Sequence, residues 1–324
     1  MKALVINGKN EPLSLETRDE PRTGEGEAIV KIHAAALNHR DLWIQKGMYA
    51  GLRYPIIPGS DGAGLLIGSD KPVIINPSIN WGDKPGHQDQ QSFRILGLPD
   101  DGTFAEYVKV PASNIVEKPA HLSFEEAAAL PLAGLTAYRA VFIRAQVRER
   151  EKVLITGIGG GVALFALQFA LAAGAQVYVT TSDGEKMRDA LSMGARDAVN
   201  YKDDNWAQEL QELAGSFDVI IDGAGGDGMN MLMNLASPGG RLVFYGATRG
   251  NPSNVEVRRI FWKQLNILGS TMGSPEDFDA MVAFVNRHHI RPIVDRVFPL
   301  AEGEAAMRHM DESRQFGKIV LKVL

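Results

Sequence analysis

From residue 152 onward, short and almost wholly apolar stretches alternate with helical stretches, and this alternation restricts the fold more than any other feature. The apolar stretches are "KVLIT", "QVYVTT", "DAVN", "FDVIID", "GRLVFYG" and "NILGST", separated by helical patterns at 161–173, 185–193, 205–214, 228–236 and 255–264. Continuous apolar strands are typical of a parallel sheet that helices cover on both faces. Six of them predict an α/β fold with a doubly wound, parallel six-stranded Rossmann domain.

The first ~110 residues have a different pattern, with short strands between clusters of glycine and proline. Strands are expected at 2–6, 27–37, 62–68, 71–77 and 104–110, and the polar stretch 78–102 is expected to be a long surface loop. Ser123 and Glu126 form a capping box that opens a helix, and Ser274-Pro275 opens another. The last residues return to strand. We therefore expect a β-rich domain of residues 1–120 and 274–324 around a dinucleotide-binding domain of 121–273.

Composition excludes several classes of function. The chain has 324 residues, a net charge of −5 and no cysteine, which excludes disulfides, cysteine nucleophiles and thiolate metal sites. No basic stripe indicates a nucleic-acid partner. No apolar run reaches membrane-spanning length, and the N-terminal residues do not form a signal peptide. A cytoplasmic protein with a small-molecule substrate is the default expectation.

A glycine-rich turn follows the first strand of the alternating region. Gly157-x-x-Gly160-x-x-Ala163 leads from that strand into a helix, where free backbone N–H groups and the helix dipole attract a pyrophosphate. Gly160 is expected where the phosphate approaches. Such turns also occur purely for tight packing. The strand before, the helix after and a second strand ending ~20 residues on favour dinucleotide binding.

The second strand ends without the carboxylate that selects NAD by binding its ribose 2′-OH. Thr181 and Ser182 stand at that place, with Lys186 and Tyr201 further along the chain. These side chains are suited to hold a 2′-phosphate by charge and hydrogen bonds, so we expect NADPH as the cofactor. Two observations leave the choice open. Ser182-x-x-Glu185 is itself a helix-capping pattern, and Asp183 brings a carboxylate close by.

The chain resembles the medium-chain dehydrogenase/reductases, in particular their zinc-independent, quinone oxidoreductase-like branch. The matching segments fall in family order over nearly the full length: "AAALNHRDLWIQKGMY", "PIIPGSDGAG", "DGTFAEYVKVP", "AAALPLAGLTAYRA", "GIGGGVALFALQFA", "MGARDAVNYKDD", "FDVIIDGAGG" and "FGKIVLKV". The resemblance implies a GroES-like, β-rich catalytic domain. It also implies a homodimer in which "NILGST" pairs across a two-fold axis.

The resemblance implies a set of site residues. Asn38 is expected beside the nicotinamide and substrate, with Tyr49 or Tyr54 lining the pocket or donating a proton. The implied cofactor contacts are Thr136, Gly160, Gly161, Val162, Gly223, Ala224, Tyr245, Gly246, Ala247, Thr248, Ser270, Thr271, Met272, Phe316 and Lys318. Alternatives remain: Asn38 only ties down a loop, the tyrosines pack a domain edge, and the glycines serve tight turns. Arg40 and Asp41 are expected to pair, with Asp41 holding the Asn38 loop.

Zinc-dependent relatives hold their metal with residues that align with Asn38, Ser60 and Leu132, none of which is a usual zinc ligand. The segment 78–102 also lacks the cysteines of the relatives' structural zinc lobe. His33, His39 and His87 have no recognisable ligand spacing. We therefore expect no metal. Asp61 aligns with a glutamate of the relatives and receives no catalytic role.

These features lead to three hypotheses. The first is an NADPH-dependent, zinc-independent reductase that transfers hydride to a quinone or an α,β-unsaturated carbonyl. The second is an enoyl-thioester reductase, and the third is a cofactor-binding protein without turnover. The sequence does not identify the physiological substrate.

Overall fold

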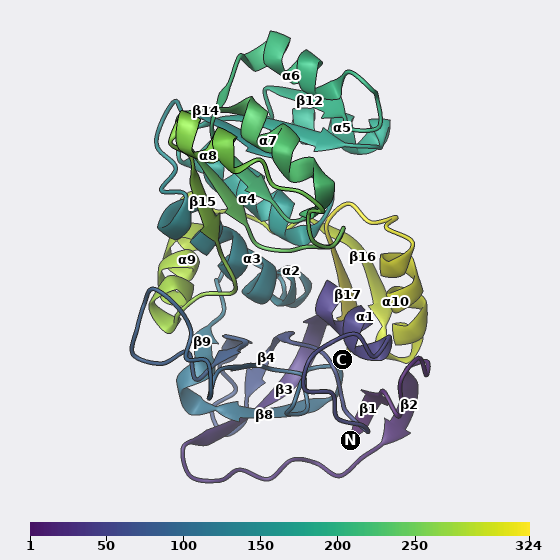
Figure 1. The fold of residues 1–324 in the computed structure, drawn as a ribbon. Helices are drawn as coiled ribbons and strands as arrows, with labels where there is room; N and C mark the ends of the chain where they lie inside the picture. Colours follow the sequence, from purple (N-terminus) through teal and green to yellow (C-terminus); the bar gives the residue numbers. More distant parts are fainter. The chain divides into compact units, whose positions relative to one another are not determined.

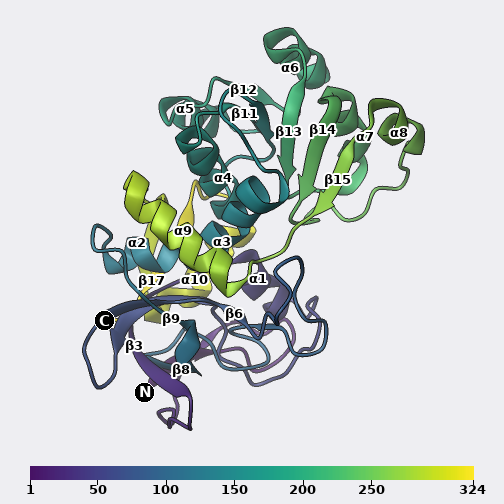
Figure 2. The ribbon, with the colours of Figure 1, turned by 90° about the vertical axis from the view of Figure 1, so that its left-hand side faces the viewer.

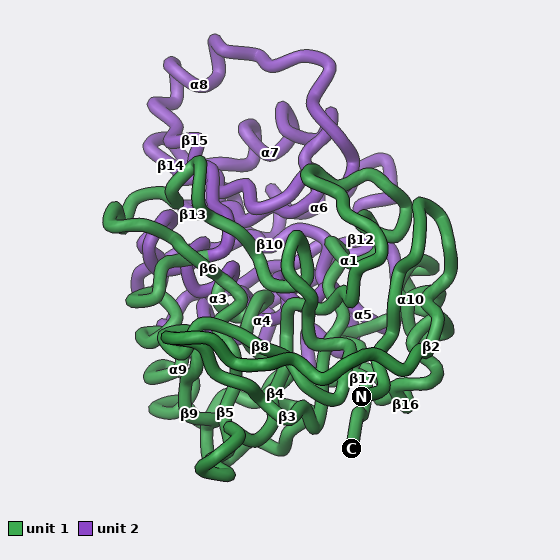
Figure 3. The backbone as a smooth tube through the Cα atoms, turned by 90° about the horizontal axis from the view of Figure 1, so that it is seen from below, with its two compact units in different colours: residues 1–135, 273–324 green, residues 136–272 purple.

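A computed structural model describes residues 1–324, and the chain divides into two compact units. Unit 1 contains residues 1–135 and 273–324, and unit 2 contains residues 136–272 (green and purple in Figure 3). Residues 121–135, which are expected from the sequence to belong to the cofactor domain, belong to unit 1. The reason is that helix α2 (Phe124–Ala129) contacts strands of the unit 1 sheet.

Unit 2 is built on one parallel sheet of six strands. Their order is β12-β11-β10-β13-β14-β15, and every neighbouring pair is parallel. The strands are β10 (Lys152–Ile155), β11 (Gln176–Thr181), β12 (Asp197–Asn200), β13 (Phe217–Asp222), β14 (Ala236–Phe244) and β15 (Asn266–Gly269). This confirms the predicted doubly wound fold.

The helices of unit 2 cover both faces of this sheet. They are α4 (Gly161–Ala172), α5 (Gly184–Ser192), α6 (Trp206–Ala214), α7 (Met229–Leu235) and α8 (Val257–Lys263). Helices α7 and α8 contact each other on one side of the strands, and α4 lies on the other side (Figure 2). The core on the α6–α7 side includes Tyr178 and Phe217, whose ring centroids are 5.4 Å apart. The unit thus presents the carboxyl ends of all six strands at one edge.

The start of α5 decides against one of the two readings of Ser182. Ser182-x-x-Glu185 is not the capping pair, because Asp183 is the N-cap residue. Its carboxylate accepts hydrogen bonds from the N–H groups of Glu185 at 2.8 Å and Lys186 at 3.2 Å. The hydroxyl of Ser182 is therefore not used in the cap.

Unit 1 is β-rich and joins both ends of the chain. Its main sheet has the order β16-β17-β3-β4-β5-β9, with β8 also paired to β3. The strands of unit 1 are β1 (Lys2–Val5), β2 (Ser14–Thr17), β3 (Glu27–Ala36), β4 (Asp61–Leu66), β5 (Pro72–Ile75), β6 (Ser78–Ile79), β7 (Arg94–Ile95), β8 (Tyr107–Pro111), β9 (Ile115–Glu117), β16 (Val294–Pro299) and β17 (Lys318–Lys322). Strand β17 pairs antiparallel with β3, so the tail does return to the first domain (Figure 1).

The helices of unit 1 are α1 (His39–Gln45), α2, α9 (Pro275–His288) and α10 (Gly303–Asp311), and α3 (Pro131–Tyr138) crosses the boundary between the units. Among the helices of unit 1, α2 and α10 contact strands of the main sheet. The capping box of Ser123 and Glu126 at α2 and the Ser274-Pro275 start of α9 are both confirmed. None of the helices combines the length and the apolar character that a membrane span requires.

The stretch 78–102 is not simply a surface loop. It contains β6 and β7, which pair with each other, and it buries Ile79, Trp81 and Leu98. The Trp81 ring meets Phe93 edge-on at 5.5 Å, and its Nε1 donates to the carbonyl of Lys84 at 3.1 Å. A few buried apolar residues at irregular spacing hold this polar segment in place. Their spacing has no helix or strand period, so the sequence pattern does not predict their burial.

Candidate active site

In unit 1 the segment from β3 into α1 places Asn38 at the N-cap of that helix. The Asp41 carboxylate accepts from the Asn38 backbone N–H at 2.8 Å and from the Gly59 N–H at 3.3 Å. Asp41 therefore joins the Asn38 turn to the segment before β4, as expected. This fixes the backbone from which the Asn38 side chain extends.

Asp41 is fully buried, and its burial raises the pKa from 3.8 to about 6. Between these values the folded protein binds more protons than the unfolded chain. The free energy of unfolding should therefore fall as the pH rises through this window, by about 3 kcal/mol in all. We expect the difference in stability between wild type and Asp41→Asn to follow this pH dependence in urea titrations at pH 4 to 7. A difference that stays constant across that range would contradict it.

A buried ion pair joins the two ends of unit 1. Lys318, in β17, is 4% exposed, and its Nζ lies 3.0 Å from Asp61 Oδ2. The same ammonium donates to Asn38 Oδ1 at 2.6 Å and to the Leu37 carbonyl at 2.6 Å. All three of its hydrogens are thus used inside unit 1. From the sequence, Lys318 is expected to contact the cofactor, but in the structure its ammonium is bonded to Asn38 and Asp61.

The Asn38 amide is held at both of its polar atoms. Its oxygen accepts from Lys318, and one Nδ2 hydrogen goes to Asp61 Oδ2 at 2.9 Å. The other Asp61 oxygen accepts from the Leu132 N–H at 2.8 Å. The second hydrogen of Asn38 Nδ2 has no protein acceptor. This arrangement fixes the amide plane and leaves one N–H donor for a ligand.

Arg40 is expected to pair with Asp41, but its hydrogen bonds go to other groups. Its Nη1 donates to Ser60 Oγ at 2.7 Å and to the Leu96 carbonyl at 2.8 Å. The guanidinium lies 5.0 Å from the centre of the Tyr49 ring. A guanidinium has a fixed fork of donors, which here suits one hydroxyl and one carbonyl better than the carboxylate on the neighbouring residue. Tyr49 is thereby packed against a cation.

Tyr54 is tied to the protein backbone. Its hydroxyl donates to the Ile44 carbonyl at 2.8 Å, and burial raises the pKa of the phenol. Both features hold the proton on this oxygen. The geometry favours the packing role for Tyr54 over proton donation.

In unit 2 the glycine-rich turn leaves the first turn of α4 without a side-chain cap. Gly160 is the N-cap residue, and a Cβ built on it would have no atom within 4 Å. Gly157 has φ +64°, a conformation that favours glycine, and its N–H donates to Thr180 Oγ1 at 3.1 Å. The first N–H groups of α4, including those of Gly161 and Val162, remain open to a ligand.

The residues at the end of β11 are brought together. The Tyr201 hydroxyl donates to Ser182 Oγ at 3.1 Å, and its backbone N–H donates to the Thr181 carbonyl at 3.0 Å. The Lys186 side chain lies against the glycine turn: a Cβ added to Gly159 would lie 3.0 Å from Lys186 Cδ. Asp183 faces its own helix, and the Lys186 N–H lowers the pKa of that carboxyl.

The loops after β13 and β14 pack closely on each other. A Cβ on Gly223 would lie 2.5 Å from the Tyr245 ring, and one on Gly246 would lie 2.8 Å from the Gly223 carbonyl. Asp222 accepts from the N–H groups of Ala224 and Gly225 at 3.1 and 2.7 Å. Burial raises the pKa of Tyr245 far above its usual value. Both glycines are thus required by packing, while Ala247 and Thr248 are exposed at this edge.

The remaining residues expected at the cofactor lie in different surroundings. Ser270 follows β15, and its Oγ is buried without a hydrogen-bond partner. Thr271 is exposed, whereas Thr136 and Met272 are buried. The Phe316 N–H donates to Asp295 Oδ1 at 2.9 Å, which fixes the turn before β17.

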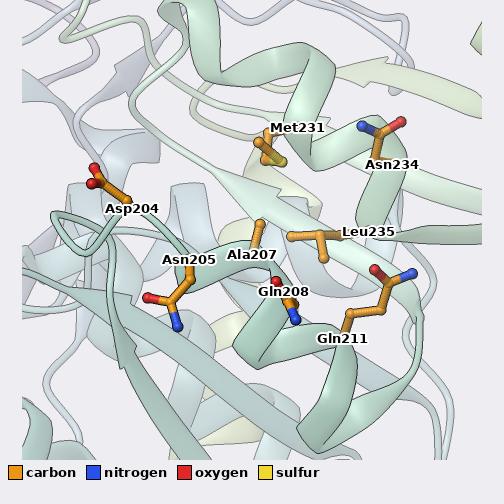
Figure 4. Close-up of a pocket in the computed structure, with 8 residues that line it drawn as sticks. All are labelled: Asp204, Asn205, Ala207, Gln208, Gln211, Met231, Asn234 and Leu235. Carbon is orange, nitrogen blue, oxygen red and sulfur yellow. The ribbon is translucent and has the colours of Figure 1, made fainter.

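A surface pocket of about 400 Å³ lies between α6 and α7 (Figure 4). It is lined by Asp204, Asn205, Ala207, Gln208, Gln211, Met231, Asn234 and Leu235. None of the residues expected to carry chemistry lines it. We therefore assign it no part in the reaction.

Both halves of the chain match known families. Residues 24–120 match the alcohol dehydrogenase GroES-like domain, and residues 161–287 match the zinc-binding dehydrogenase family. A zinc-type alcohol dehydrogenase-like protein of Schizosaccharomyces pombe is 37% identical, over 92% of this chain and 91% of that protein. The chain belongs to the medium-chain dehydrogenase/reductase superfamily.

Other superfamily members differ in chemistry. A crystal structure of an NAD-dependent alcohol dehydrogenase has a TM-score of 0.95 and 35% identity, with full coverage of both chains. The quinone oxidoreductase of Thermus thermophilus, solved with NADPH, has a TM-score of 0.84 and 30% identity, also with full coverage. An acryloyl-coenzyme A reductase of Metallosphaera sedula is 28% identical over 99% of both chains. This chain is thus an oxidoreductase by family.

Residues 161–287 match the zinc-binding dehydrogenase family, but Asn38, Ser60 and Leu132 do not fit that metal. Ser60 Oγ donates to the Leu96 carbonyl at 2.7 Å and also accepts from Arg40, and the apolar side chain of Leu132 has no atom that could ligate a metal. The amide oxygen of Asn38 is bonded to the Lys318 ammonium. Zinc in proteins is bound by thiolate, imidazole or carboxylate groups. The positive charges of Lys318 and Arg40, which are fixed beside Asn38 and Ser60, also repel a metal cation.

The dinucleotide of this superfamily fits the carboxyl edge of unit 2. Gly160, Gly161 and Val162 would hold its pyrophosphate through backbone N–H groups, since no side chain fills that space. The orphaned Ser270 Oγ offers a hydrogen bond at the end of β15. When bound, the nicotinamide supplies a hydride.

Sequence reasoning missed the Lys318–Asp61 pair. A signal was present, since each charged residue begins a strand and is followed directly by small or apolar residues, "DGAGLL" and "KIVL". A charge inside such a strand needs a buried partner of opposite sign. The two residues are separated by more than 250 positions in the chain, so the sequence does not show that they are partners.

Proposed function

We propose that this protein is an NADPH-dependent, zinc-independent reductase of quinones or α,β-unsaturated carbonyl compounds. The observation that carries the proposal is the Asn38 amide, held between Lys318 and Asp61 with one N–H left for a ligand. This amide stands where metal-dependent relatives place a zinc ligand. A hydrogen-bond donor suits conjugate reduction, in which charge develops on a carbonyl or quinone oxygen.

The chemistry assigned to this chain is electrostatic. Hydride adds to the β-carbon of the acceptor, and the electron pair of the double bond moves toward the carbonyl oxygen. Asn38 Nδ2 donates to that oxygen. The Lys318 ammonium polarises the amide through its oxygen and so strengthens the N–H donor. A proton from water then completes the saturated product.

The choice of NADPH rests on the end of β11. Ser182, Tyr201 and Lys186 offer hydroxyl and ammonium groups there, and Asp183 is engaged as a helix cap. A 2′-phosphate is favoured by such donors and opposed by a free carboxylate. The relative solved with NADPH supports this choice, whereas the NAD-dependent relative stands for the alternative.

An acceptor panel tests the proposal. Consumption of NADPH would be followed at 340 nm with a simple quinone, an enone and a crotonyl thioester, and NADP⁺ reduction would be followed with a primary alcohol. We expect turnover with the quinone or the enone and none with the alcohol. Turnover of the thioester alone would favour an enoyl-thioester reductase, an alternative that the acryloyl-coenzyme A reductase relative supports. Tight NADPH binding without any turnover would favour a non-catalytic protein.

We also propose a homodimer that forms through the edge strand β15. Next to that strand, α8 exposes large apolar side chains, with Trp262 82% and Phe261 62% exposed. An exposed edge strand with apolar neighbours is a natural site of association.

Replacing Trp262 with glutamate should convert the dimer to monomers in sedimentation velocity without loss of folding, because most of this residue is exposed within the chain. Met48→Glu is the control, since Met48 is 67% exposed but lies in unit 1. A wild type that is monomeric at 100 μM, or a Trp262→Glu dimer as stable as wild type, would contradict the proposal.

A further inference from the structure

Arg249 follows β14 and lies at the same edge as the end of β11. Its guanidinium carbon is 4.9 Å from the centre of the Tyr201 ring. The Arg249 N–H donates to the Ala224 carbonyl at 2.8 Å, and a Cβ on Gly226 would lie 3.0 Å from Arg249 Cβ. The backbone of this arginine is therefore fixed against the loop after β13.

The ring beneath Arg249 connects it to the residues assigned to the 2′-phosphate. The Tyr201 hydroxyl donates to Ser182 Oγ at 3.1 Å, and Thr181 immediately precedes Ser182. Arg249 is exposed and makes no ion pair with a carboxylate. Its five N–H donors thus lie beside a hydroxyl pair without a negative partner in the chain.

A second cation approaches from another element. Lys186, in the first turn of α5, lies against Gly159 of the glycine turn. A ribose phosphate carries about 1.5 to 2 negative charges at neutral pH, more than one lysine neutralises. Guanidinium is suited to bind phosphate through two parallel hydrogen bonds.

We propose that Arg249 is a specificity-determining residue that binds the 2′-phosphate of NADPH together with Lys186, using the Tyr201 ring as its platform. This inference rests on the proposed use of NADPH and names a residue that the strand-end pattern does not contain. The loop after β14 would thus contribute to the choice between the phosphorylated and unphosphorylated cofactor.

The test uses two fragments of the cofactor and no electron acceptor. Adenosine 2′,5′-bisphosphate and 5′-AMP would be titrated into wild type and Arg249→Gln by calorimetry. We expect the variant to weaken the bisphosphate at least tenfold and AMP less than twofold. Arg249→Lys, which keeps the charge, should recover most of the loss. Arg258→Gln, an exposed arginine on α8, is the matched control and should change neither affinity.

Two outcomes would overturn the inference. Equal weakening of both fragments would mean that Arg249 stacks on adenine, and unchanged affinities would mean that it contacts neither. The test is also separable from the proposed function. A wild type that binds AMP as tightly as the bisphosphate would refute the use of NADPH itself, whereas a wild-type preference that survives Arg249→Gln would refute only the role of Arg249.

Discussion

Replacing Lys318 with methionine should lower the free energy of unfolding by about 3 to 5 kcal/mol. The ammonium is the buried cation that faces Asp61, whose side chain is 0% exposed. Without it, the buried Asp61 carboxylate loses its ion-pair partner, and Asn38 Oδ1 and the Leu37 carbonyl lose their donor. Leaving a buried charge unpaired costs more than the intact pair contributes.

Urea unfolding would measure this loss. Lys322→Met is the matched control, because Lys322 lies on the same strand and is exposed. It should change stability by less than about 0.5 kcal/mol. Adding Asp61→Leu to Lys318→Met should recover part of the loss, since the unpaired carboxylate is then removed. Equal small effects of the two lysine substitutions would contradict the role given to Lys318.

Replacing Gly160 with aspartate should separate stability from cofactor binding. The backbone at Gly160 has φ −78° and ψ 152°, and a Cβ there meets no atom within 4 Å, so the side chain fits. An aspartate at this N-cap accepts from the first N–H groups of α4 and complements the helix dipole. The unfolding free energy should therefore stay level or rise by a few tenths of a kcal/mol. NADPH affinity should fall by about 100-fold or more, because the carboxylate takes the donors and repels the pyrophosphate.

Fluorescence titration with NADPH and thermal unfolding would be measured on the same preparations. Gly160→Ala is the control, because it adds a methyl group to the same open space and leaves the N–H groups free. It should keep NADPH affinity within a few fold. If Gly160→Asp bound NADPH as tightly as Gly160→Ala, the pyrophosphate would not lie at this helix.

The architecture of unit 2 was predictable because its signal is local. Buried parallel strands are continuous apolar runs, and the residues that start and end each helix lie within a few positions of its ends. The segment 78–102 was not predictable in the same way. Its few buried residues have no period: Trp81 contacts Phe93 and Lys84 within the segment, whereas Ile79 and Leu98 join the main apolar core of unit 1.

The candidate site shows the same division. The places of Ser182 and Gly160 after the ends of two strands could be predicted, because the strands themselves are recognisable in the sequence. The partners of Asn38 do not, because Lys318 reaches it only through the pairing of β17 with β3, which aligns Val320 with Ala36. Arg249 likewise meets Tyr201 only because two loops share one sheet edge. Contacts between distant segments are fixed by topology, which a local pattern does not contain.

In the reaction that we propose, hydride transfer is assisted by the Asn38 amide and the Lys318 ammonium and needs no metal ion. The most direct measurement is the rate of NADPH oxidation with an enone or quinone by enzyme dialysed against a strong chelator, with metal content determined by elemental analysis on the same sample. We expect an unchanged rate at less than about 0.05 metal ions per chain. Loss of activity on dialysis that stoichiometric zinc restores would contradict it.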